Sequence, residues 1–94
     1  MSEQRFKPSN ELTFGTVQND SARLHKLFTT GTISNLSFEL DNVNYCDSAG
    51  LALLIETKRL CKQHNVRLEI KGVPKSISAL AEFCGVEGML ESTA

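Results

Sequence analysis

The sequence carries almost no excess of charge of either sign. Ten Lys and Arg residues stand against eleven Asp and Glu residues, which gives a formal net charge of −1 over 94 residues. The sequence pI is close to 6.1. A protein that neutralises the phosphates of nucleic acid needs a basic surface, usually seen as a strongly basic domain. The charge balance therefore does not favour DNA or RNA as a partner.

Long hydrophobic stretches are missing as well. No segment approaches the roughly 18 consecutive apolar residues of a membrane-spanning helix, and residues 1–5 lack the apolar centre of a signal peptide. We therefore expect a cytoplasmic protein without direct membrane insertion. A chain of 94 residues is expected to form a single domain over residues 1–94, with one core and little room for an enclosed substrate cavity.

Cysteines and catalytic motifs are also scarce. Cys46, Cys61 and Cys84 are odd in number and unlike disulfide scaffolds in spacing, so we expect reduced residues that serve packing. The chain has no Gly-x-x-x-x-Gly-Lys phosphate loop and no Gly-x-Ser-x-Gly nucleophile motif. Cys61 and His64 lie on one predicted helix, but a metal site needs further ligands. The sequence predicts no catalytic residue, no metal and no cofactor.

Hydrophobic periodicity predicts an α/β fold. Period-two alternation indicates strands over residues 4–8, 12–14, 36–40 and 66–70. Apolar stripes of helical period indicate helices over residues 21–30, 48–64 and 74–84. The first two strands are expected to form a hairpin at the sheet edge, with Leu12 and Phe14 facing inward. This order predicts a mixed β-sheet of about four strands with helices packed mainly on one face.

Capping residues mark the expected helix ends. Residues 19–21 (Asn-Asp-Ser) offer side-chain oxygens for the start of the first helix, and Gly31 fits the left-handed position after its end. Pro74 suits the first position of the last helix, and Gly85 follows that helix.

A strand is expected to pass into the second helix through residues 46–51 (Cys-Asp-Ser-Ala-Gly-Leu). Asp47 or Ser48 starts that helix, because a short side-chain oxygen can accept a hydrogen bond from a first-turn amide. Gly50 lowers helix propensity in the first turn, which suggests that backbone or a partner approaches too closely for a β-carbon.

This motif resembles that of the STAS domain family, in which a strand leads to Asp-Ser or Asp-Thr, a small residue, Gly, Leu and an apolar helix. The resemblance extends over about residues 12–90 through the order of elements. It implies the STAS fold and a non-enzymatic module that binds another protein. The continuation over residues 51–54 (Leu-Ala-Leu-Leu) is most similar to the stand-alone, MlaB-like STAS subunit of Mla-type phospholipid-transport ABC complexes.

The resemblance implies a different partner in each of two subfamilies. In the preferred interpretation, the partner is the ATPase subunit of a phospholipid-transport ABC complex, which the chain would stabilise or regulate at the inner membrane. The alternative is an anti-sigma factor antagonist, which would bind an anti-sigma factor kinase. In that subfamily a phosphorylated serine matches Ser48. The simpler interpretation of Ser48 is a plain N-cap.

The same segment predicts a docking surface. Small residues beside an apolar pair, with basic residues nearby, are typical of a protein-binding patch. Leu51 and Ile55 lie on a flank of the helix, where exposure and packing under a neighbouring helix are both open alternatives. The predicted partner-binding or regulatory residues are Asp47, Ser48, Ala49, Gly50, Leu51, Ala52 and Ile55.

Overall fold

The computed structural model describes residues 3–30 and 32–90. The predicted α/β class is confirmed. Within the described ranges, no helix is long and apolar enough to cross a membrane. The elements are β1 (Glu3–Phe6), β2 (Glu11–Leu12), α1 (Val17–Thr30), β3 (Asn35–Glu39), β4 (Tyr45–Cys46), α2 (Ser48–Gln63), β5 (Arg67–Lys71), α3 (Lys75–Phe83) and the 3-10 helix η1 (Glu87–Leu90).

The described strands form two parallel sheets. β3 lies between β1 and β5, and β2 pairs separately with β4. The predicted hairpin is therefore wrong, because β1 and β2 each pair with a later strand. The connection between them is held by α1 instead. Asp20 accepts hydrogen bonds from the Ser9 amide at 3.1 Å and the Ser9 hydroxyl at 2.9 Å.

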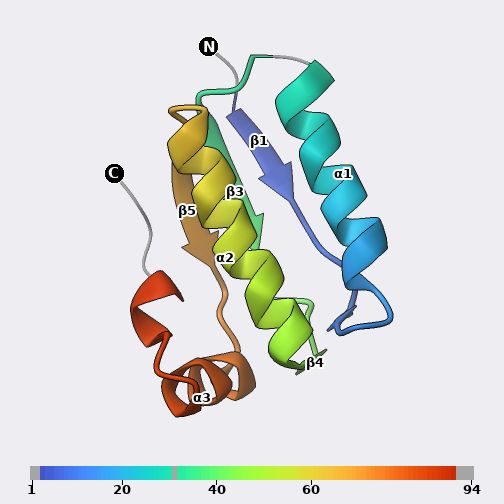
Figure 1. The fold of residues 1–94 in the computed structure, drawn as a ribbon, viewed down its shortest axis with the longest axis vertical. Coiled ribbons are helices and arrows are strands. Elements are labelled where there is room, and N and C mark those ends of the chain that lie inside the picture. The colour runs from blue at the N-terminus through green and yellow to red at the C-terminus, as the bar shows by residue number, and fades with distance from the viewer. Residues whose placement is uncertain (1–2, 31, 91–94) are drawn as a thin grey trace.

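The helices α1 and α2 pack against each other and run antiparallel to the strands of the larger sheet (Figure 1). Both helices therefore begin at the end of the molecule where those strands finish. The core fills the space between helices and sheet with large apolar side chains. Leu24, Phe38, Leu54 and Leu68 are each at most 1% exposed.

The other face of the three-stranded sheet is polar. Phe6 packs against Phe38 in the core with the two rings tilted, so the neighbouring Arg5 points to the opposite face. There the Arg5 guanidinium donates to the Glu39 carboxylate at 2.7 Å. Glu69 and Lys71 on β5 alternate with buried Leu68 on the same principle, and their charged groups lie 3.6 Å apart. One face of the sheet thus builds the core, and the other carries paired charges.

The first helix begins earlier than predicted, at Val17. Thr16 precedes it, and its hydroxyl accepts from the Thr13 amide at 2.9 Å and donates to the Glu11 carbonyl at 2.6 Å. Asp20, predicted among the capping residues, belongs to the first turn of α1, and its side chain is fully buried. The predicted role of Gly31 falls outside the described residues.

The end of the chain follows the prediction more closely. Gly85 has φ of 75°, the left-handed conformation expected after α3. Pro74 occupies the N-cap position, one residue before the predicted one. Cys61 is buried in the core as expected, whereas Cys84 is exposed.

Candidate functional site

The candidate site lies at the end of the molecule where α1 and α2 begin (Figure 1). β4 leads into α2 through the single residue Asp47, and the turn of residues 13–16 leads from β2 into α1. Pairing of Leu12 with Cys46 brings these two segments together. We call residues 13–16, β4 and residues 47–52 the tip.

Asp47 uses both carboxylate oxygens at the tip. Oδ1 accepts hydrogen bonds from the amides of Ala49 at 2.9 Å and Gly50 at 3.1 Å, so Asp47 is the N-cap of α2. Oδ2 accepts from the Phe14 amide at 3.1 Å. The amide of Phe14, followed by those of Gly50 and Ala49, holds the pKa of Asp47 below its usual value. The carboxylate therefore joins α2 to the turn before α1.

Ser48 is the first residue of α2 rather than its cap. The interpretation of Ser48 as a plain N-cap is wrong, because Asp47 takes that role. Ser48 is exposed, and its hydroxyl makes no hydrogen bond within the described ranges. Its oxygen is thus open to a partner or to modification.

Gly50 and Leu51 are buried beneath this surface. A β-carbon at Gly50 would collide with the Leu12 carbonyl oxygen and lie 2.7 Å from the Cys46 sulfur. The predicted close approach is therefore made by the chain's own backbone. Leu51 is only 3% exposed and belongs to the core, so packing is the correct alternative and exposure the wrong one.

The remaining predicted residues reach the outside. Ala52 is exposed, Ile55 is 47% exposed, and Ala49 is partly buried. Together with Asp47 and Ser48, they leave a small, mostly uncharged surface on the first two turns of α2. Only Asp47 bears a charge among these five.

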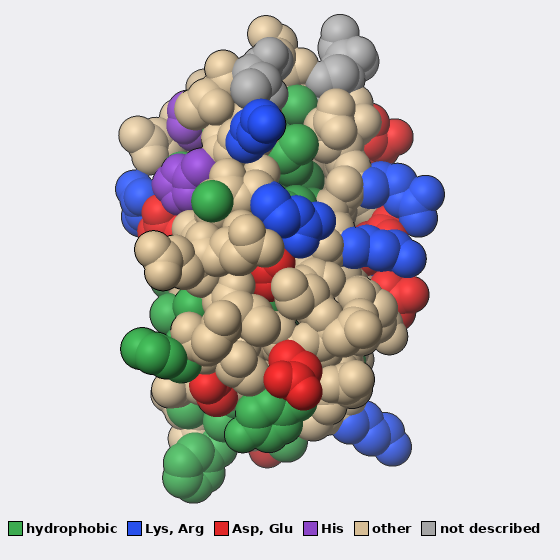
Figure 2. All heavy atoms as spheres, turned by 90° about the vertical axis from the view of Figure 1, so that its right-hand side faces the viewer, with side chains coloured by type: hydrophobic (Ala, Val, Ile, Leu, Met, Phe, Trp, Pro, Cys, Tyr) green, Lys and Arg blue, Asp and Glu red, His purple; other side chains and the backbone are tan. Residues whose placement is uncertain are grey.

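Two exposed aromatic residues at the tip were missed from the sequence. Phe14 is 85% exposed and Tyr45 is 56% exposed. Figure 2 shows hydrophobic side chains standing out at the lower end of the molecule, the end at which α1 and α2 begin. The prediction that Phe14 faces inward is wrong because β2 ends at Leu12, and the chain turns before the alternation can continue. Gly15 directly after Phe14 was the available turn signal.

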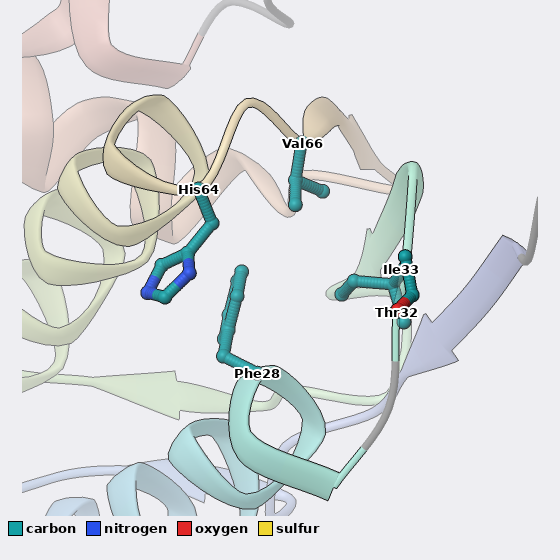
Figure 3. A pocket seen from close by; sticks show the side chains of 5 residues that line it. All are labelled: Phe28, Thr32, Ile33, His64 and Val66. Atoms are coloured by element: carbon teal, nitrogen blue, oxygen red, sulfur yellow. The ribbon is translucent and has the colours of Figure 1, made fainter.

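A pocket lies at the opposite end of the molecule, where α1 and α2 end (Figure 1), and Figure 3 shows its lining from close by. Its volume is about 200 Å³, and its lining residues come from the ends of α1 and α2 and from the segments before β3 and β5. Ring centroids of two of them, Phe28 and His64, lie 5.1 Å apart. The full lining is Phe28, Thr32, Ile33, His64 and Val66.

The surroundings of two thiols, those of Cys46 and Cys61, favour the protonated form. Burial raises the pKa of Cys61 to about 11, and burial together with the Asp47 charge raises that of Cys46 to about 11. Both thiols are therefore protonated at neutral pH, whereas the thiolate is the metal ligand and the nucleophile. Among the residues described, no group of three or more His, Cys, Asp or Glu side chains could hold a metal ion.

Comparison with known proteins gives one consistent family. The STAS domain family matches residues 5–93. Anti-sigma-B factor antagonists of Staphylococcus aureus strains NCTC 8325 / PS 47 and COL are each 32% identical to the chain over 84 residues. The alignments cover 89% of this chain and 77% of each relative. No solved structure matches the chain.

Proposed function

Because this chain belongs to the STAS domain family, we propose that it is an anti-sigma factor antagonist that binds its partner at the tip. The observation that carries the proposal is Ser48, which is exposed at the first position of α2 while Asp47 does the capping. The names of the curated relatives support the same function. The alternative considered from the sequence thus becomes the preferred one.

Phosphorylation of Ser48 would act through charge. A phosphate adds roughly two negative charges at neutral pH. A helix N-terminus normally stabilises an anion, but the amides of Ala49 and Gly50 already donate to the Asp47 carboxylate. The phosphate on Ser48 would therefore lie beside the Asp47 carboxylate, and the amides of Ala49 and Gly50 would not be free to bind it. A doubly charged, hydrated group on this small, mostly uncharged surface would weaken docking.

The partner in this proposal is an anti-sigma factor of the serine-kinase type. Such a protein would bind the unmodified tip and transfer the γ-phosphoryl group of ATP to the Ser48 oxygen, with release of ADP and of the hydroxyl proton. The ATP site belongs to the kinase, in keeping with the lack of a phosphate loop in this chain. This function places the chain in the cytoplasm.

The role as adapter of a transport ATPase has weaker support. Its basis in the sequence was the run of residues 51–54, and Leu51, Leu53 and Leu54 are all buried. These three buried side chains pack in the core and are not available for contact with a partner. Binding to an ABC ATPase at the inner membrane is therefore the competing outcome of the test.

The test mixes the purified chain with a purified serine-kinase anti-sigma factor from the same organism and ATP, followed by intact-mass analysis and a binding assay. We expect one phosphate on Ser48, release of the kinase, and tight binding by Ser48→Ala without modification. Ser48→Glu is expected to bind weakly. Binding to a purified ABC ATPase in place of the kinase, with Ser48 unmodified, would contradict the proposal.

A further inference from the structure

Phe14 is exposed on a backbone that is held firmly in place. The Thr16 and Val17 amides both donate to the Thr13 carbonyl at 2.9 Å, and the Gly15 amide donates to the Thr13 hydroxyl at 3.2 Å. The Thr16 hydroxyl closes the turn from the other side. The aromatic ring, 85% exposed, is thus carried by a turn with several internal hydrogen bonds. A large apolar side chain displayed in this way is typical of a preorganised contact.

The same turn is bonded directly to the start of α2. The Phe14 amide donates to Asp47 Oδ2 at 3.1 Å, and the Asp47 amide donates to the Leu12 carbonyl at 3.0 Å. Asp47 is followed at once by Ser48. Phe14 is therefore hydrogen-bonded to Asp47, and Ser48 is the next residue after Asp47, so both lie beside Asp47 at one end of the molecule.

We propose that Phe14 is an aromatic anchor of the docking surface and selects an anti-sigma factor with an apolar pocket beside the site that receives Ser48. This inference rests on the proposed function, because it names a feature of the same partner. Its basis is the continuity between the turn and Ser48 through Asp47. Aromatic residues that enter a pocket contribute a disproportionate share of binding energy at protein interfaces.

Asp47 is the positioning residue for this anchor. One oxygen caps α2 and the other holds the Phe14 amide. Asparagine caps helices about as well as aspartate but has a single acceptor oxygen, and its nitrogen cannot accept from an amide. Asp47→Asn therefore keeps the cap and removes the hydrogen bond to the turn.

The experiment measures binding of the purified serine-kinase anti-sigma factor to unmodified wild type and variants by calorimetry. Phe14→Ala is expected to weaken binding about tenfold or more, while Phe14→Leu, which keeps an apolar side chain, retains most of the affinity. Phe83→Ala is the matched control. Phe83 is 90% exposed at the end of α3, which lies across the start of α2 from the turn of residues 13–16 (Figure 1). Its removal is expected to leave the affinity unchanged.

A double-mutant cycle tests the positioning role of Asp47. Asp47→Asn is expected to weaken binding in wild type and to have little further effect in Phe14→Ala, because the turn then has no ring to position. Equal binding of wild type and Phe14→Ala would overturn the anchor and leave the proposed function standing. Equal losses in Phe14→Ala and Phe83→Ala would also overturn it. If wild type itself fails to bind the kinase, the proposed function fails and the anchor fails with it.

Discussion

Gly50 has no room for a larger side chain. The atoms in the way of a β-carbon include the Leu12 carbonyl oxygen, which belongs to the backbone and cannot rotate aside. We expect Gly50→Ala to lower the free energy of unfolding by about 2 kcal/mol or more, the usual cost of overpacking. Gly88→Ala is the control, because nothing lies within 4 Å of its β-carbon position. Urea denaturation of both variants checks this, and equal midpoints would contradict it.

Asp47 links stability to pH. Its pKa is lower in the folded chain than its ordinary value of 3.8, chiefly because the Phe14 amide donates to the carboxylate. Such a group stabilises the fold above its unfolded pKa, and the contribution is lost as the pH falls through its folded pKa. The difference in unfolding free energy between wild type and Asp47→Asn is therefore expected to be largest near neutral pH and to shrink below pH 3.8. Denaturation at a series of pH values measures it, and a difference independent of pH would exclude this linkage.

At the scale of the element, α2 presents two apolar residues one turn apart with opposite roles. Leu51 is 3% exposed and Ile55 is 47% exposed. Leu51→Ala is expected to cost about 2–5 kcal/mol of stability through the cavity it leaves. Ile55→Ala is expected to cost less, because about half of its side chain is already in water. Thermal or chemical denaturation of the pair decides the matter, and equal costs would show that the two positions do not differ in packing.

The periodic elements could be predicted because their pattern is local. β3 and β5 alternate, and α2 begins at Ser48 as expected, since Asp47 and the apolar stripe lie next to each other in the sequence. The pairing of β1 with β3 and of β2 with β4 could not be predicted in this way. Each of these strands pairs with a segment far along the chain, and such a contact leaves no periodic signal in the sequence.

The candidate site was predicted in part for the same reason. Asp47, Ser48 and Gly50 form a motif whose chemistry is readable along the chain. Whether Leu51 is exposed depends on the elements that pack over it, and a projection of a single helix does not include those elements. Phe14 is predicted to face inward if the alternation of the strand continues to residue 14. β2 ends at Leu12 instead, and the Thr16 hydroxyl bonds to the Thr13 amide and the Glu11 carbonyl in the turn that follows.

At the scale of the whole molecule, we expect the isolated chain to have no ATPase activity and no bound metal. The chain lacks a phosphate loop, and the thiols of Cys46 and Cys61, with pKa values of about 11, stay protonated. Phosphate release assays on the chain, the kinase and their mixture check the first point, and metal analysis after chelation checks the second. Turnover by the isolated chain above buffer background would show that an active site has been overlooked.

The polar face of the sheet also bears on how copies of this protein behave when concentrated. β1 and β5 are the outer strands of the three-stranded sheet, and outer strands can recruit further strands into fibres. Glu3 and Arg5 on β1, and Arg67, Glu69 and Lys71 on β5, place a charge at every second position. A strand added from another copy would have to bring its own side chains against these charges and strip their water. The alternation of charged and apolar residues thus disfavours aggregation through this sheet, while the apolar residues of the same strands fill the core on the other face.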